Sequence, residues 1–128
     1  MNPISAPPAP PPAPPDAGPF CLALTTVPDE PQAQALAERL VRERLAACVQ
    51  LVAIRSVYVW NDALCREPEW LLLIKTRSAL WEALQAAVRR GHSYQTPELL
   101  RLPVDAGSPD YLAWLAAACR PAAPGGAG

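Results

Sequence analysis

Histidine is scarce in this chain, which holds a single one, His92, among 128 residues. The four cysteines are Cys21, Cys48, Cys65 and Cys119. They form no Cys-x-x-Cys pair, and none lies near His92 in the sequence. Because zinc sites usually draw their ligands from close pairs, we expect no structural zinc site. We expect the cysteines to be reduced and to behave as small apolar residues.

An excess of basic charge is also missing. The chain has 11 Lys and Arg residues against 12 Asp and Glu residues, which gives a formal net charge of -1. Proteins that bind nucleic acids usually present a basic face to phosphate, and the longest basic run here is the pair Arg89-Arg90. The same shortage excludes a polybasic membrane patch. We therefore expect no nucleic-acid partner and no membrane partner.

Long apolar runs are absent as well. A run such as residues 70–74, WLLLI, is far shorter than the roughly 20 apolar residues that a membrane-spanning helix needs. No charged segment followed by an apolar stretch opens the chain, so we expect no secretory signal. These absences predict a cytoplasmic protein.

The common catalytic motifs are missing too: the sequence contains no GxSxG, no HExxH and no glycine-rich phosphate loop. His92 and Ser93 are adjacent, and neighbouring side chains rarely align as a base and a nucleophile. We therefore expect that the protein is not an enzyme.

Proline, in contrast, is abundant, and eight of the 17 prolines lie within residues 1–18. Such a segment cannot bury enough apolar surface to offset the entropy that ordering would cost. We predict a disordered tail at 1–18, a second one at 121–128, and one folded domain at 19–120.

Hydrophobic periodicity divides that domain into strands and helices. Runs rich in β-branched, aromatic and aliphatic residues predict strands at 20–26, 48–60, 69–75 and 98–104. The run 69–75 does not alternate, so we expect it to be buried on both faces. Three- and four-residue spacing predicts helices at 30–46, 78–90 and 110–120. Asp29 and Ser78 are the expected caps, Asn61-Asp62 the expected hairpin turn, and Gly91 the expected end of the second helix.

The resulting order, β-α-β-β-α-β followed by a helix, predicts an α+β, ferredoxin-like sandwich with two helices on one face of an antiparallel sheet. The middle strands are long and apolar for so small a sheet. Tyr58, Trp60 and Trp70 would leave apolar surface exposed in a monomer, and large apolar patches usually mark an interface. We therefore predict an oligomer that forms through these strands.

Several short segments, taken in order, carry a family resemblance. They are TTVPDE (25–30), ERLAACV (43–49), SVYVW (56–60), LLIKT (72–76), HSYQTPE (92–98), ELLRLPV (98–104) and YLAWL (111–115). Over residues 20–119 the chain resembles the CutA family of divalent-cation tolerance proteins. The resemblance implies a ferredoxin-like homotrimer built through long hairpin strands and similar in architecture to the PII signalling regulators. It also implies a link to tolerance of copper and other divalent ions, without an established enzymatic activity.

The resemblance places His92 and Glu98 on a His-x-Tyr-x-x-Pro-Glu segment that is implicated in metal binding in some members. Imidazole and carboxylate together suit a borderline ion such as Cu²⁺. Some members add a cysteine at the position of Thr25, so that thiolate is missing here. The alternative for His92 is a locally hydrogen-bonded histidine at a helix end, where the helix dipole favours its charged form. Lys75 is a candidate pairing cation for Glu98.

Two functions stay open. The first is a trimeric divalent-cation tolerance protein that responds to metal ions and binds Cu²⁺ or another divalent metal through His92 and Glu98. The second is a PII-like signalling trimer whose inter-subunit clefts bind a small anionic ligand or a protein partner near Lys75 and Tyr94. No organic cofactor is expected in either case. A stable trimer that acts only as a scaffold is a third option.

Overall fold

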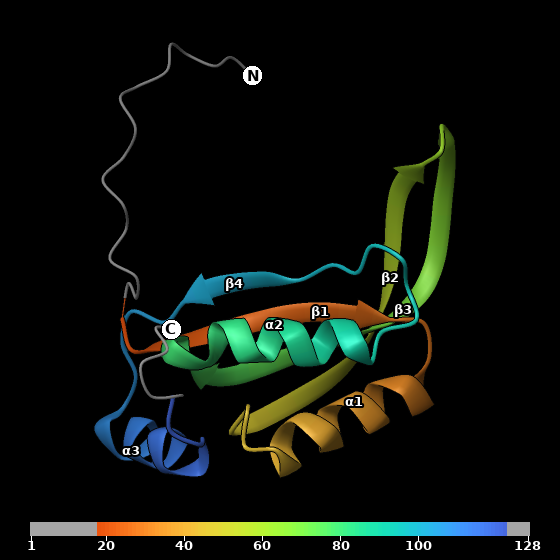
Figure 1. The fold of residues 1–128 in the computed structure, drawn as a ribbon. Coiled ribbons are helices and arrows are strands. Elements are labelled where there is room, and N and C mark those ends of the chain that lie inside the picture. The colour runs from red at the N-terminus through yellow and green to blue at the C-terminus, as the bar shows by residue number, and fades with distance from the viewer. Residues whose placement is uncertain (1–17, 123–128) are drawn as a thin grey trace, which may run out of the picture.

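A computed structural model describes residues 18–122, so nearly all of the tails predicted at 1–18 and 121–128 lies outside the described residues. The elements are β1 (Phe20–Val27), α1 (Glu30–Arg42), β2 (Cys48–Trp60), β3 (Ala63–Arg77), a 3-10 turn (Ser78–Leu80), α2 (Trp81–Arg90), β4 (Leu100–Pro103) and α3 (Pro109–Ala118). This order confirms the predicted α+β, ferredoxin-like pattern with a terminal helix (Figure 1). No helix among residues 18–122 is long and apolar enough to cross a membrane.

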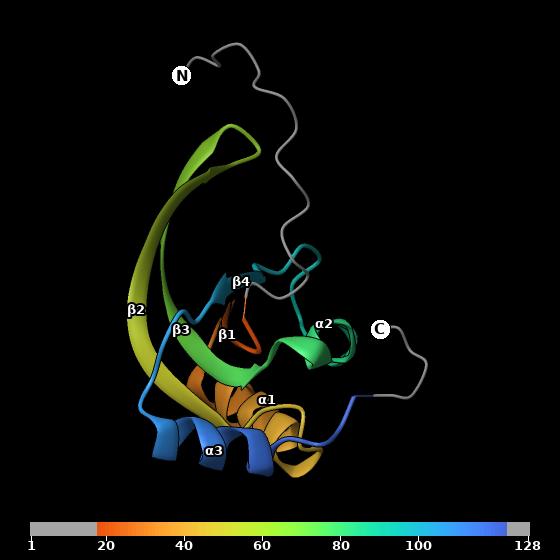
Figure 2. The same cartoon turned by 90° about the vertical axis from the view of Figure 1, so that its left-hand side faces the viewer.

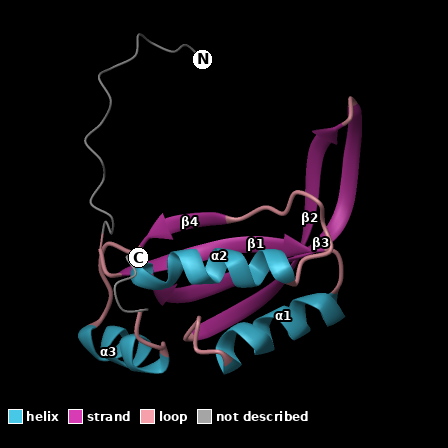
Figure 3. Ribbon diagram, in the orientation of Figure 1, coloured by secondary structure: helices cyan, strands magenta, loops and turns pink. Residues whose placement is uncertain are grey.

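The strands form one antiparallel sheet in the order β2-β3-β1-β4. Leu24 of β1 marks the register, because it pairs with Leu73 of β3 on one side and with Leu100 of β4 on the other. Helices α1 and α2 lie on the same face of this sheet, while α3 lies at one end (Figures 2 and 3). Two layers therefore enclose the core, as the predicted sandwich requires.

The core fills the space between the sheet and the two helices. Its buried side chains include Ala23, Val27, Leu36, Leu40, Leu72, Ile74, Leu84 and Val88. Leu40, Leu72, Ile74 and Leu84 are 0% exposed. Each such side chain contributes about 1.5–3 kcal/mol relative to an exposed one. Burial of this stripe therefore fixes which face of the sheet the helices cover.

The opposite face of the sheet is apolar but is not covered by α1 and α2. Alternate residues of a strand point to opposite faces, so the buried Leu72 and Ile74 put Leu71 and Leu73 on this side, where they are only half-buried. We call this surface the open face; by register it holds Leu22, Leu24, Val52, Leu71, Leu73, Leu100 and Leu102. The expectation that 69–75 is buried on both faces is therefore correct for one face of the single chain only.

Strands β2 and β3 form a hairpin whose tip extends beyond the rest of the sheet (Figure 1). Asn61 and Asp62 connect them as predicted, with φ angles of 52° and 64°. Both values lie in the left-handed region that a two-residue hairpin turn needs to match the strand twist. The tip is exposed and apolar: Val57 is 67% exposed and Val59 65%.

Two of the predicted boundaries that differ from the structure do so because backbone hydrogen bonds end or extend the elements elsewhere. Helix α1 stops at Arg42 rather than at residue 46, since Arg44 adopts a φ of 59° and the Leu45 N–H turns back to the carbonyl of Leu40. Strand β3 begins at Ala63 rather than at 69. Its polar first half, which resembles a loop in sequence, pairs residue by residue with β2.

The predicted helix caps had mixed outcomes. Asp29 does cap α1, because its Oδ1 accepts a hydrogen bond from the Gln32 N–H over 2.9 Å. Ser78 does not cap α2: its hydroxyl donates to the carbonyl of Gly18 instead, and a 3-10 turn precedes the helix. Gly91 ends α2 as predicted. A side chain there would collide with the Arg39 guanidinium, 2.6 Å from the position of an added Cβ.

Candidate functional site

The loop 91–99 joins α2 to β4 and is attached to one end of β1 at two points. The Nε2 atom of His92 lies 2.7 Å from the carbonyl oxygen of Thr26. The hydroxyl of Thr25 donates a 2.7 Å hydrogen bond to the carbonyl of Glu98. These bonds explain why β4 starts only at Leu100 and not at 98. The structure therefore brings His92 and the backbone of Glu98 to consecutive residues of one strand.

The partners of His92 define its tautomer. A backbone carbonyl can only accept, so Nε2 must carry a proton and donate it to Thr26. The backbone N–H of Tyr94 donates to Nδ1 over 3.1 Å. This is the neutral ring with both nitrogens engaged inside the protein. The locally hydrogen-bonded alternative for His92 therefore describes its present contacts.

The Glu98 carboxylate is not drawn into a cluster. Within residues 18–122 its oxygens make no hydrogen bond or ion pair, and the residue is exposed. Lys75, the expected pairing cation, instead places its Nζ 5.6 Å from the centre of the Tyr111 ring. The described part of the chain holds no group of three or more His, Cys, Asp or Glu side chains that could hold a metal ion.

A second set of polar contacts links the loop to the hairpin. The hydroxyl of Tyr94 donates a 2.7 Å hydrogen bond to the carboxylate of Glu69, which is only 7% exposed. Glu67 lies two residues closer to the hairpin tip than Glu69, and it accepts a 2.9 Å hydrogen bond from the hydroxyl of Tyr58. Two phenol–carboxylate pairs thus lie on one side of the hairpin.

These contacts keep both phenols protonated. Burial, followed by the hydrogen bond to Glu69, raises the pKa of Tyr94 well above its ordinary value. The hydrogen bond to Glu67 is the largest cause that raises the pKa of Tyr58 to about 12. An ionised phenol would lose its donated proton and would face a carboxylate of like charge. Each hydroxyl therefore acts as a donor to its glutamate.

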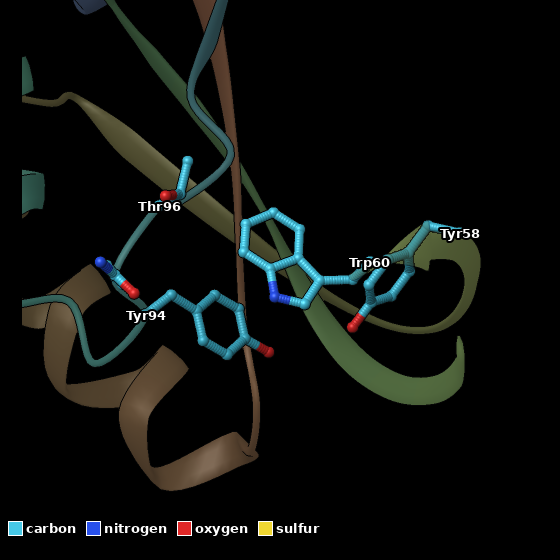
Figure 4. A pocket seen from close by; sticks show the side chains of 5 residues that line it. Tyr58, Trp60, Tyr94 and Thr96 are labelled. Carbon is cyan, nitrogen blue, oxygen red and sulfur yellow. The ribbon is translucent and has the colours of Figure 1, made fainter. Parts of the chain in front are cut away.

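A cavity of about 220 Å³ lies between the hairpin tip and the loop. It is lined by Tyr58, Trp60, Tyr94, Gln95 and Thr96, and we call it the aromatic cleft. Figure 4 shows the ring of Tyr94 directed toward the indole of Trp60, with Tyr58 from the same strand beside it. The loop bends at residues 94–96, and Tyr94 brings the third ring from a distant part of the sequence.

The predicted ligand-cleft residues line two different cavities. Tyr94 belongs to the aromatic cleft. Lys75 lines a second cavity of about 210 Å³, together with Cys21, Tyr111 and Leu115. Cys21 is buried there, and burial raises the pKa of its thiol. A ligand held by Lys75 and Tyr94 together stays a prediction.

The predicted interface residues also differ in position. Tyr58 is 38% exposed and Trp60 is 52% exposed, both near the hairpin tip. Trp70 instead pairs with Val27 and Ala53 in the sheet and packs partly against the protein's own core. The exposed apolar surface predicted for a single chain is therefore present at the hairpin tip, where Tyr58 and Trp60 lie. Trp70 is less exposed than these two residues.

Sequence reasoning missed Glu67 and Glu69 as site residues. Their spacing could have indicated them. Glu67 and Glu69 lie two residues apart on β3, so they share a face, and Glu69 directly precedes an apolar run. A carboxylate at such a position needs a partner when it is buried. That partner, Tyr94, comes from a loop 25 residues later in the chain, which no local pattern indicates.

Comparisons with known proteins agree on one family. A model of the family described as CutA1 divalent ion tolerance protein matches residues 21–118. The chain is 45% identical over 106 residues to the divalent-cation tolerance protein CutA of Pectobacterium atrosepticum, covering 80% of this chain and 96% of that one. It is 41% identical over 115 residues to protein CutA of Mus musculus, covering 89% of this chain and 65% of the mouse protein.

A solved structure supports the same relationship. The chain is similar to the crystal structure of CutA1 from Oryza sativa with a TM-score of 0.78 and 39% sequence identity. That match covers 80% of this chain and 95% of the rice chain. The family is named for tolerance of divalent ions and not for a catalysed reaction. Because the family match spans nearly all of the described residues, this chain belongs to the CutA1 family of divalent ion tolerance proteins.

Proposed function

We propose that this chain acts in divalent-cation tolerance as a homotrimer that binds Cu²⁺ or another divalent ion through His92 and Glu98. The observation that carries the metal site is the attachment of both residues to the same end of β1, through Thr26 and Thr25. Family membership supports the biological role, since the family is named for tolerance of divalent ions.

The contacts of His92 fit a metal ligand. Metal-binding histidines usually donate one ring N–H to a carbonyl or carboxylate, which orients the ring and leaves the other nitrogen for the ion. Here the Nε2–H bond to Thr26 is such an orienting contact. A metal at Nδ1 would replace the N–H of Tyr94, which lies in the same loop. Glu98 offers a free carboxylate, and water or a neighbouring subunit would supply the remaining ligands.

The trimer is proposed from two exposed apolar surfaces. The open face exposes Leu100 by 55%, Leu102 by 42% and Val52 by 41%. The hairpin tip adds Tyr58 and Trp60, and β3 adds the exposed part of Trp70. Burial of these surfaces against other copies would remove them from water, which is the main driving force of association.

The predictions about catalysis, location and the PII-like alternative also belong to this proposal. A role in ion tolerance requires no catalysis, so the protein is proposed not to be an enzyme, and a cytoplasmic location stays a prediction. The PII-like alternative is favoured by one observation, the aromatic cleft beside Tyr94. An anionic ligand does not fit it well, since none of its lining residues is Lys or Arg.

The test is a calorimetric titration of the full-length protein with Cu²⁺, with the particle mass measured by light scattering. We expect a mass of three times the 13.7 kDa chain. His92→Ala should weaken Cu²⁺ binding by about tenfold or more. Ser93→Ala is the matched control, because the Ser93 hydroxyl donates an exposed hydrogen bond to the Gln32 side chain and both proposed ligands remain. Equal Cu²⁺ affinity in the His92 variant and the wild type would overturn the metal site.

A further inference from the structure

Two buried thiols, Cys21 and Cys119, lie near the end of the sheet where α3 packs, and the proposed function uses neither of them. We propose that this pair is a modification site, at which a peroxide oxidises the two thiols to a disulfide within one chain. Both are free thiols in the structure, and their residues are 1% and 3% exposed. Neither residue belongs to the open face or to the hairpin tip, so the proposed trimer does not need their surfaces.

Thr76 is the neighbour that the two cysteines share. In the sheet register, Cys21 pairs directly with Thr76 across β1 and β3. The side chains of such a pair lie on the same face of the sheet, with Cβ atoms about 4.5–5.5 Å apart. The Sγ atom of Cys119 lies 3.6 Å from the hydroxyl oxygen of Thr76. Both thiols are therefore next to one side chain, although they come from opposite ends of the domain.

A cavity beside the pair gives a small oxidant room to reach it. This cavity of about 210 Å³ is lined by Cys21 and by Leu115, which lies one helical turn before Cys119. Among its lining residues only Leu22 belongs to the open face, and residues 104–107 and α3 of the same chain form much of its wall. A water molecule occupies about 30 Å³ in the liquid, so the cavity has room for hydrogen peroxide, which is little larger.

Cys21 by itself is protected from oxidation in the resting protein. Burial is the largest cause that raises the pKa of its thiol, and a hydrogen bond with Ser78 opposes this effect. The thiolate is the form that reacts, so a buried thiol with a raised pKa reacts slowly. The oxidation therefore begins at Cys119, and Cys21 acts as the resolving thiol that completes the disulfide.

Cys119 becomes accessible when the end of α3 opens, because it directly follows the last residue of that helix, Ala118. The Arg44 guanidinium holds this end by donating to the carbonyls of Ala117 and Cys119 over 2.9 and 3.0 Å. The Arg120 N–H donates in turn to the carbonyl of Arg44 over 2.8 Å. Hydrogen bonds near the surface open more readily than those of the core. The contacts of Arg44 therefore limit how often an oxidant reaches Cys119.

The two steps conserve atoms and electrons. The thiolate of Cys119 attacks one oxygen of hydrogen peroxide, which breaks the O–O bond, forms a sulfenic acid and, with the thiol proton, releases water. The thiol of Cys21 then displaces the sulfenic hydroxyl, so the S–S bond forms and a second water leaves with the Cys21 proton. The sulfurs lose the two electrons that the peroxide gains. The new bond closes a loop that contains nearly the whole domain, and such a crosslink raises the Tm.

The test counts free thiols of the full-length protein in denaturant, before and after treatment with one equivalent of hydrogen peroxide. A chelator is present throughout, which excludes oxidation by copper. The wild type should fall from its four free thiols to two per chain, and dithiothreitol should restore all four. Peptide mapping should find Cys21 joined to Cys119. The Tm of the oxidised protein should be higher by about 5 °C or more.

Three variants test the assignment. Cys119→Ala should keep its three remaining thiols free after peroxide treatment. Cys65→Ala is the matched control: Cys65 lies on the hairpin, so this variant should fall from three free thiols to one. Arg44→Gly removes the contacts to α3 at a position where glycine accepts the φ of 59°. It should form the same disulfide about threefold faster or more.

A wild type that keeps four free thiols, or a disulfide between other cysteines, would overturn the proposal. An unchanged rate in Arg44→Gly would overturn the entry of the oxidant through the end of α3. Cu²⁺ affinity of the reduced protein, measured on separate samples without chelator, reports on the proposed metal site alone, because neither cysteine is one of its ligands.

Discussion

The hydroxyl of Tyr94 donates a 2.7 Å hydrogen bond to the carboxylate of Glu69, and this bond connects the loop after α2 to the hairpin. Glu69 is 7% exposed, so little water can replace the phenol as its partner. Tyr58 and Glu67 make the same kind of bond, of 2.9 Å, between exposed residues. The protein thus contains a buried and an exposed version of one interaction, which allows the effect of burial to be measured.

Tyr94→Phe should lower the free energy of unfolding by about 1.5–3 kcal/mol, the usual contribution of a hydrogen bond to a charged group. The substitution keeps the ring but leaves a buried carboxylate without its donor. Tyr58→Phe should cause a smaller loss, because water can solvate the exposed Glu67. Urea unfolding of the two variants and the wild type measures both effects. Equal losses in the two variants would show that burial of Glu69 does not set the strength of its bond.

Stability should decrease in alkaline solution because of the same phenols. The pKa of Tyr58 is raised to about 12 in the folded protein, and that of Tyr94 is raised further. In the unfolded chain both groups ionise near pH 10. Below about pH 10 both states are protonated and the stabilisation is complete; above it the unfolded state loses protons first, so the free energy of unfolding falls as pH rises toward 12 and beyond.

Denaturant unfolding between about pH 9 and about pH 12 measures this slope. The double variant Tyr58→Phe, Tyr94→Phe removes both groups and should show a flatter dependence on pH than the wild type. Tyr58→Phe alone should flatten only part of it. An unchanged slope in the double variant would assign the alkaline loss to other groups.

The order of elements followed from the sequence because it depends on local patterns. Runs of β-branched, aromatic and aliphatic residues located the four strands, period-3.6 spacing located the three helices, and Asp29 marked the start of α1. Local patterns failed where long-range pairing decides the outcome. Residues 63–68 have the composition of a loop, yet they form a strand because a continuous β2 offers them a partner at every position.

The site was predictable only in part, for the same reason. The loop containing His92 was identified as the place of the polar chemistry, but its attachment to Thr25 and Thr26 depends on the arrangement of the fold. The direction of Lys75 toward Tyr111 equally depends on where α3 packs. The apolar run 69–75 predicted burial on both faces, and a single chain supplies helices for only one of them. The proposed trimer would supply the other cover.

The hairpin turn allows a test of backbone conformation at the tip. Asp62 has a φ of 64°, a region that glycine adopts freely and that other residues occupy at a cost. Asp62→Gly gives the sequence Asn-Gly, which two-residue hairpin turns favour, and should raise the free energy of unfolding by about 0.5–1 kcal/mol. Asp62→Ala is the control, because it removes the same carboxylate without relieving the backbone, and it should destabilise the protein. Thermal and urea unfolding measure both variants. If both substitutions lower stability by similar amounts, the Asp62 side chain and not its backbone conformation determines the contribution of the turn.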